Sequence, residues 1–154
     1  EKIVDTAVCI IMNERGDFLL QKKDMGYRWF PGKWCLFGGG LEKDEKHEDA
    51  LKRELTEELN YCPNDLKFFK ERNYEDRMGD TIKKWKHFIY TCTFTGKISD
   101  ISLNEGAGFA FFAYEEIDKI DIVEREKDLV KEYYTCRGSW QPSKSSKNRF
   151  ENLS

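Results

Sequence analysis

The chain has 154 residues, about the length of a single domain. It carries 26 basic and 29 acidic residues, a formal net charge of −3, so it lacks the basic excess of a general nucleic-acid-binding protein. No segment approaches the roughly 18 consecutive apolar residues that a membrane span requires. We therefore expect a globular domain that forms no stable nucleic-acid complex and does not enter a membrane.

The cysteines are spread along the whole chain, at Cys9, Cys35, Cys62, Cys92 and Cys136. None forms a CxxC or CxxH pair, and an odd number without clustering is not typical of a disulfide framework or a zinc site. Cys9 and Cys92 lie inside apolar runs, where a free cysteine behaves as a small apolar residue. We predict reduced, structural cysteines and a cytoplasmic protein.

The first third of the chain has the pattern of strands and turns. Residues 7–12 are almost continuously apolar, which is typical of a strand covered on both faces. Residues 13–17 have turn chemistry around Gly16, and residues 18–21 resume the extended pattern. A loop follows at residues 26–32. Residues 34–37 form a short apolar segment that leads into three consecutive glycines, and we expect those glycines to form a loop.

The clearest predicted helix covers residues 47–59. Ala50, Leu51, Leu55 and Leu59 recur at helical spacing, and a proline at position 63 follows the end of the pattern. These four apolar residues predict one buried face.

The remaining segments complete an α/β pattern. Strands are expected at residues 65–72, 81–95 and 108–113, a short helix at 115–117, and a longer helix at 124–135. Strands interrupted by a central helix and followed by C-terminal helices predict a mixed sheet with helices on its faces. We expect one domain over residues 1–136. Residues 137–154 are polar and low in complexity, which indicates a flexible tail.

The central helix carries three carboxylates on one face. Glu54, Glu57 and Glu58 stand at positions i, i+3 and i+4, beside the apolar stripe. Residues 38–61 hold eight acidic and four basic residues, so a net charge of −4 is concentrated there and the rest of the chain is at +1. Crowded carboxylates repel one another unless a cation is present, and hard oxygen ligands suit Mg²⁺ or Mn²⁺. Such an ion is suited to bind a diphosphate and to activate water.

A plainer interpretation is a solvated acidic helix face, with Arg53 and Glu57 as an ordinary i,i+4 ion pair. The three glycines before the helix argue against it, because a solvated helix does not require them. These residues alone leave both interpretations open.

The spacing of these residues resembles a known family. Gly39 is followed by five residues, Glu45, seven residues, and then Arg-Glu-Leu-Thr-Glu-Glu-Leu-Asn-Tyr over residues 53–61. This pattern is similar to the Nudix box of the MutT/Nudix hydrolases, G-x5-E-x7-R-E-U-x-E-E-x-G-U, where U is apolar. Every charged position matches, and residues around the box, about 3–135 in all, resemble the family's domain.

Three positions depart from the family pattern. Asn60 replaces a glycine, but asparagine tolerates the left-handed conformation and can end a helix. Asp44 replaces a frequent glycine. Lys46 stands where a serine or threonine cap is common, so we expect a weakly capped helix start.

The resemblance implies an α/β/α sandwich around a mixed β-sheet. It also implies metal-dependent attack of water on phosphorus, which cleaves a nucleoside diphosphate from a linked moiety. The implied metal ligands are Glu54, Glu57, Glu58 and the carbonyl of Gly38, with Mg²⁺ as the cofactor and Mn²⁺ as an alternative. Arg53 corresponds to the arginine that orients the glutamates, and Glu45 to the residue that fixes loop and helix. Glu105 is the candidate for a further catalytic glutamate outside the box, against the alternative of an ordinary exposed loop acid.

The substrate is less defined by the sequence. Arg28 and Gly39 are candidates for contacts with phosphate or sugar, and Trp34 and Phe109 are candidate stacking faces for a base, as are Trp29, Phe30 and Trp85. Core packing is the competing role of each aromatic residue. The family's substrate-specific signatures are absent, including a tyrosine at position 78, which is Met78. We expect a small nucleotide partner such as a nucleoside triphosphate or nucleotide sugar, and the resemblance admits a homodimer. The alternative function is a Nudix-fold nucleotide-binding or regulatory module that has lost catalysis.

Overall fold

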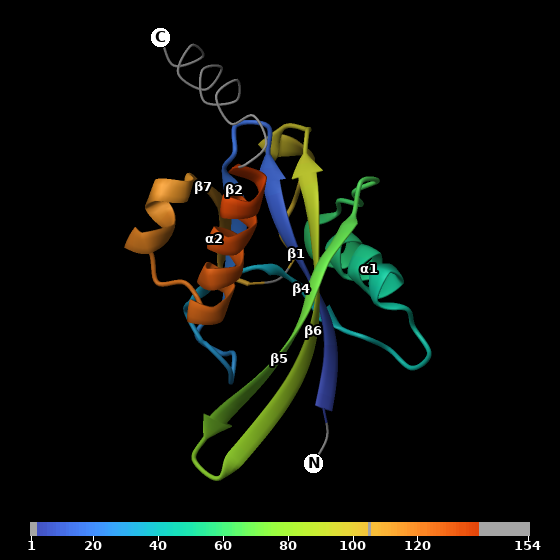
Figure 1. Cartoon of the computed structure of the whole chain (residues 1–154), viewed down its shortest axis with the longest axis vertical. Coiled ribbons are helices and arrows are strands. Elements are labelled where there is room, and N and C mark those ends of the chain that lie inside the picture. Colours follow the sequence, from blue (N-terminus) through green and yellow to red (C-terminus); the bar gives the residue numbers. More distant parts are fainter. Residues whose placement is uncertain (1–2, 105, 139–154) are drawn as a thin grey trace. The chain divides into compact units, whose positions relative to one another are not determined.

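The computed structural model describes residues 3–104 and 106–138 of the chain (Figure 1). Within these residues the elements, in chain order, are β1 (Ile3–Asn13), β2 (Phe18–Lys22), β3 (Trp34–Cys35), β4 (Phe37–Gly40), α1 (His47–Leu59), β5 (Lys67–Met78), β6 (Thr81–Phe94), the 3₁₀ helix η1 (Ile98–Asp100), β7 (Gly108–Phe112), the 3₁₀ helix η2 (Tyr114–Lys119) and α2 (Glu124–Gly138). The chain divides into two compact units. The first unit contains residues 3–10, 37–92 and 96–104, and the second unit contains 11–36, 93–95 and 106–138.

The first unit is built on three strand pairings. Strand β4 pairs antiparallel with β1, with Val8 opposite Gly38 and Ala7 opposite Gly39. Strands β5 and β6 form a long antiparallel hairpin, with Tyr74 opposite Trp85. Strand β6 is also hydrogen-bonded to β1, and Figure 1 shows these two strands running in the same direction, so the sheet is mixed.

Helix α1 has the predicted bounds and buries the predicted face. Ala50, Leu51, Leu55 and Leu59 are all fully buried, and the helix contacts strand β4. Burial of a leucine side chain contributes about 1.5–3 kcal/mol before the entropic cost of ordering it, so this face is the main reason that the helix forms. The helix therefore has a fixed rotation about its axis, which decides where its glutamates point.

The two ends of α1 are held differently. At the start, Lys46 makes no side-chain capping hydrogen bond, as expected from its type. His47 stacks instead on Phe88 of β6, with ring centroids 4.2 Å apart, and hydrogen-bonds the Tyr90 hydroxyl through Nδ1. At the end, Asn60 adopts the left-handed conformation (φ 55°, ψ 37°), and its N–H donates to the Thr56 carbonyl. Asn60 thus ends the helix in the left-handed conformation that a glycine usually adopts at this position.

The second unit is organised around β2. This strand pairs antiparallel with the last residues of β1, with β3 and with β7. Phe18, Leu19 and Leu20 of β2 are fully buried, and Ile117 of η2 and Val130 of α2 are buried as well. The N–H of Trp34 donates to the Asp121 carbonyl at 2.8 Å, which ties β3 to the segment before α2. Among the described residues, no helix is long and apolar enough to cross a membrane.

The structure confirms the predicted α/β class and corrects several element boundaries. The three glycines, expected as a loop, are strand residues of β4. Strand β5 was expected over 65–72 but runs from Lys67 to Met78, because its polar residues all pair with β6. Helix α2 continues to Gly138, into the range predicted as a tail; residues 139–154 lie outside the described residues.

All five cysteines are free, in agreement with the absence of a disulfide pattern. Cys9 on β1 and Cys92 on β6 are buried, with their Sγ atoms 3.6 Å apart. Burial raises the pKa of the Cys9 thiol well above its ordinary value, and the neighbouring Cys92 acts in the same direction. Both thiols therefore pack as apolar groups.

Candidate active site

The glycines of β4 lie against the backbone and the acidic helix. A Cβ atom at Gly38 would be 2.1 Å from the Ala7 carbonyl oxygen, and one at Gly39 would be 2.3 Å from the carboxyl carbon of Glu54. Gly38 also has a φ of 154°, which side-chain-bearing residues rarely adopt. The glycines are thus required for close approach within a strand rather than for a bend in a loop.

Arg53 joins the strand, the loop and the helix. Its Nε and Nη2 donate to the two carboxylate oxygens of Glu45 at 2.9 and 3.0 Å, and Nη2 also donates to the Gly40 carbonyl at 3.1 Å. Nη1 donates to Glu54 at 2.9 Å and to Glu57 at 3.4 Å. One guanidinium therefore contacts two of the three clustered glutamates, and the planar fork of arginine suits such multiple contacts.

The charges in this network perturb one another. Hydrogen bonds from Arg53, with a smaller contribution from the Glu42 backbone, hold the pKa of Glu45 below its ordinary value. The hydrogen bond to Glu45 raises the pKa of Arg53, with burial opposing and Glu54 adding to the rise. Glu45 is thus ionised and Arg53 charged at neutral pH. The ion pair between them links the loop before α1 to the middle of the helix.

The three clustered glutamates differ in exposure. The side chain of Glu57 is 59% exposed, that of Glu54 is 19% exposed, and Glu58 as a whole is 5% exposed. Among the described residues, no group of three or more His, Cys, Asp or Glu side chains is gathered closely enough to form a metal centre in the present rotamers. Glu57 points toward Arg53, but its exposure leaves it room to rotate. The donor set of carboxylate oxygens beside a bare glycine backbone fits a hard divalent cation.

Residues 102–104 complete the C-terminal end of α1. The N–H of Ser102 donates to the Leu59 carbonyl at 3.1 Å, and the N–H of Asn104 donates to the Glu58 carbonyl at 2.9 Å. The side-chain Nδ2 of Asn104 donates to the Glu57 carbonyl at 2.7 Å. Sequence reasoning missed this contact, because nothing local to residues 102–104 indicates that they meet a helix more than forty residues earlier in the chain.

Of the remaining predicted site residues, Arg28, Trp34 and Phe109 lie in the second unit. Trp34 packs edge-on against Phe112, with centroids 4.8 Å apart, and the Arg28 guanidinium lies 6.0 Å from the Trp29 ring centre. Phe109 lies on β7 opposite Gln21. Glu105 lies outside the described residues.

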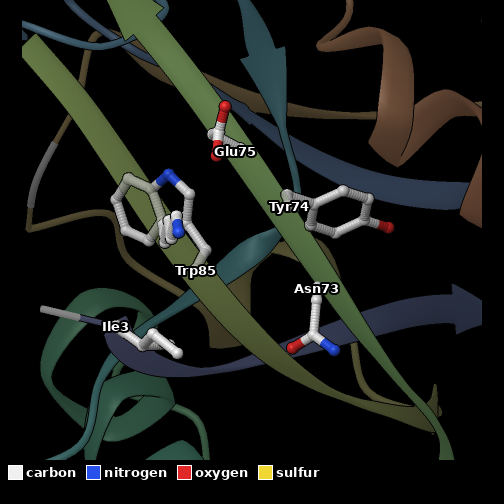
Figure 2. Close-up of a pocket in the computed structure, with 6 residues that line it drawn as sticks. Ile3, Asn73, Tyr74, Glu75 and Trp85 are labelled. Atoms are coloured by element: carbon white, nitrogen blue, oxygen red, sulfur yellow. The ribbon is translucent and has the colours of Figure 1, made fainter. Parts of the chain in front are cut away.

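Trp85, a candidate stacking face, lines a hollow in the first unit (Figure 2). The hollow has a volume of about 250 Å³, and its lining residues are Ile3, Asn73, Tyr74, Glu75, Lys84 and Trp85. Along β1, Ile3 is five residues from Val8, which pairs with Gly38, so about 16 Å of strand separates the hollow from the glycines. Lys83 lies over the Trp85 ring, 4.0 Å from its centre. The hollow is therefore distinct from the glutamate cluster.

Comparison with known proteins identifies the family of this chain. The chain belongs to the NUDIX domain family, whose model matches residues 2–133. It is 48% identical over 54 residues to nucleoside triphosphatase NudI of Enterobacter sp. strain 638, a match that covers 35% of this chain and 38% of that protein. NudI of Klebsiella pneumoniae strain 342 is 46% identical over the same length and coverage. The match thus spans well under half the length of these relatives.

Solved structures show the same fold. A MutT protein from Methanosarcina mazei Go1 superimposes with a TM-score of 0.72 at 19% identity, covering 92% of this chain and 98% of that chain. The NUDIX domain of Shewanella oneidensis NrtR, solved in complex with ADP ribose, also gives 0.72, at 14% identity and 88% coverage of both chains. The resemblance to MutT/Nudix hydrolases noted in the sequence is confirmed, and the chain has the fold of that family.

Proposed function

We propose that this chain is a divalent-metal-dependent hydrolase that cleaves the pyrophosphate linkage of a nucleoside diphosphate joined to another moiety, such as a nucleoside triphosphate or a nucleotide sugar. The observation that carries the proposal is the placement of Glu54, Glu57 and Glu58 at neighbouring positions of one helix face. Arg53 donates hydrogen bonds to Glu54 and Glu57, and Gly39 lies directly against the carboxyl group of Glu54. The names of the NudI relatives and the ADP ribose complex of NrtR support a nucleotide substrate.

In this proposal Glu54, Glu57, Glu58 and the carbonyl of Gly38 hold Mg²⁺, or Mn²⁺ in its place. A bound divalent ion neutralises charge on the phosphate oxygens and lowers the pKa of coordinated water. The protein contributes fixed positions. The buried face of α1 sets the side of the helix on which the carboxylates lie, and Arg53 donates hydrogen bonds to Glu54 and to the more exposed Glu57.

The roles of the remaining residues belong to the same proposal. Glu54 and Glu57 are the candidate proton acceptors among the clustered glutamates, and Glu105 is the candidate outside them. The bare backbone at Gly39 admits a phosphate group, and Arg28, Trp34 and Phe109 supply a cation and two aromatic faces for the nucleotide. The reduced cysteines support a cytoplasmic location.

The test is hydrolysis of a nucleotide panel with Mg²⁺, with Mn²⁺ and with chelator. The panel contains nucleoside and deoxynucleoside triphosphates, ADP-ribose, nucleotide sugars and dinucleoside polyphosphates, and products are identified by ³¹P NMR. We expect hydrolysis of at least one member only when metal is present. Glu57→Gln should reduce this activity by orders of magnitude, because it removes a charged oxygen ligand.

The matched control is Glu48→Gln, on the same helix, where Glu48 forms a surface ion pair with Lys52 at 3.3 Å. It should retain activity. Full activity in Glu57→Gln would overturn the assignment of the site. Absence of hydrolysis across the panel, with nucleotide binding retained in calorimetry, would instead establish the non-catalytic binding module.

A further inference from the structure

The end of helix α1 presents an electrostatic difficulty. The last four carbonyls of a helix have no partners within it, and the helix dipole places partial negative charge there. In α1 this last turn also carries Glu57 and Glu58, and it contains no basic residue. A lysine or arginine side chain can bond such carbonyls, but here its charge would be drawn to the adjacent carboxylates.

The structure meets this difficulty with neutral donors. The Thr56 carbonyl accepts the Asn60 N–H at 2.9 Å, and the Leu59 carbonyl accepts the Ser102 N–H at 3.1 Å. Asn104 supplies both remaining donors, its N–H to Glu58 at 2.9 Å and its Nδ2 to Glu57 at 2.7 Å. All four terminal carbonyls are therefore satisfied without the addition of a positive charge.

Asn104 is the only side chain in this set of donors. Its amide contacts the carbonyl of the most exposed of the three clustered glutamates, Glu57, whose own carboxylate reaches Arg53 at 3.4 Å. The backbone of Glu57 is thus fixed by Asn104 from one side, while its carboxylate is oriented by Arg53 from the other. Asparagine suits this position because its amide donates two hydrogen bonds and carries no charge.

We infer that Asn104 is a positioning residue for the metal ligands: it fixes the backbone of Glu57 and Glu58 while leaving their carboxylates to the cation. This inference rests on the proposed function, since it assigns Asn104 a task only if the glutamates bind metal. A simple helix cap at Asn104 would stabilise the fold only. A positioning residue would in addition set the affinity of the glutamates for the metal.

The experiment measures Mn²⁺ binding by electron paramagnetic resonance, without nucleotide, in the wild-type chain and in Asn104→Ala, Asn104→Ser and Ser102→Ala. Asn104 is exposed, so Asn104→Ala removes one hydrogen bond without opening a cavity. We expect its Mn²⁺ dissociation constant to rise about 3- to 10-fold, the range that corresponds to one lost hydrogen bond. Asn104→Ser retains a shorter side-chain donor and should lose less.

Ser102→Ala is the matched control, because Ser102 caps the helix through its backbone N–H and its exposed side chain is not needed for that bond. It should bind Mn²⁺ like the wild type. Circular dichroism fixes a temperature at which every variant is folded. In activity assays, Asn104→Ala should need more metal for half-maximal rate, with the nucleotide KM unchanged at saturating metal.

The outcomes separate the two hypotheses. A Mn²⁺ affinity in Asn104→Ala within twofold of wild type, or an equal loss in Ser102→Ala, would overturn the positioning role, as would a wild-type chain that binds no Mn²⁺. A wild-type chain that binds Mn²⁺ but hydrolyses no nucleotide would refute the proposed function. In that case the effect of Asn104→Ala on Mn²⁺ affinity would still decide the inference.

Discussion

The carboxyl group of Glu54 lies against the backbone of Gly39 so closely that a Cβ atom on the glycine would be 2.3 Å from its carboxyl carbon and 2.5 Å from one of its oxygens. Gly39 has no positive φ, so its backbone is one that alanine adopts without strain. A glycine is therefore required at position 39 because of the Glu54 carboxyl group and not because of its own backbone conformation. This relationship links strand β4 to helix α1, whose positions are separately fixed by pairing with β1 and by the buried helix face.

Gly39→Ala should therefore displace the Glu54 carboxylate. Because a misplacement of about 1 Å in an active site can cost about 100-fold in rate, we expect a loss of that order in kcat, with the helix content retained. Gly40→Ala is the matched control, since a Cβ there meets only the Asp5 carbonyl at 3.9 Å. Steady-state kinetics with saturating Mg²⁺ measure both variants. Equal activity in the two would show that the Gly39–Glu54 contact is dispensable.

Arg53→Lys should impair the site although it keeps the positive charge. A lysine cannot reproduce the bidentate pair with Glu45 together with the bonds to Glu54 and the Gly40 carbonyl. Loss of partners that orient metal ligands typically costs about 10- to 100-fold in activity or metal affinity, and we expect this range. Arg77→Lys, in an exposed pair with Glu75 at 3.7 Å, is the control and should be silent. The measurement is the hydrolysis rate as a function of metal concentration. Equal rates and equal metal dependence in Arg53→Lys and Arg77→Lys would contradict the prediction.

Glu126 gives the second unit a pH-dependent stability. The residue is 8% exposed, and its carboxylate accepts a hydrogen bond from the Leu36 N–H at 2.6 Å. Burial raises the pKa of Glu126, and the bond to Leu36 only partly opposes this. Since the folded-state pKa lies above the unfolded one, the contribution to stability is full below about pH 4.3 and is lost as the pH rises through the folded pKa.

Glu126→Gln keeps an acceptor for Leu36 but removes the ionisation. The Tm of the variant minus that of the wild type should consequently increase from pH 4 to pH 8, and each kcal/mol of difference corresponds to about 2–4 °C in a domain of this size. Glu124→Gln, on the same helix with a 79% exposed side chain, should show no such trend. Thermal melts at several pH values measure this. A difference that stays flat with pH would rule out the burial effect.

Glu105→Gln tests the catalytic glutamate that the family resemblance implies outside the box. A general base contributes about 100- to 10,000-fold, so kcat should fall by at least the lower figure, and the acidic limb of the pH–rate profile should shift or disappear. Glu14→Gln, in the exposed turn after β1, serves as the control for a surface glutamate. Near-normal turnover of Glu105→Gln would remove this residue from the mechanism.

The sequence by itself determined helix α1 and its ends. Apolar residues at helical spacing predicted His47–Leu59 and its buried face, and Asn60 was recognised as a residue able to end the helix. The box spacing placed Arg53 and the three glutamates within two turns of this helix. These features were accessible because helical periodicity and capping depend on residues only a few positions apart in the chain.

Only the tertiary structure decided how that helix is held. The glycines expected as a loop are a strand, because their backbone pairs with β1 some thirty residues earlier, and Gly39 is needed for the approach of Glu54. The carbonyls of Glu57 and Glu58 are satisfied by Asn104, which no local pattern connects to them. Such contacts arise from strand pairing and chain return between distant segments, and their partners are set by the packing of the whole unit rather than by the residues beside them.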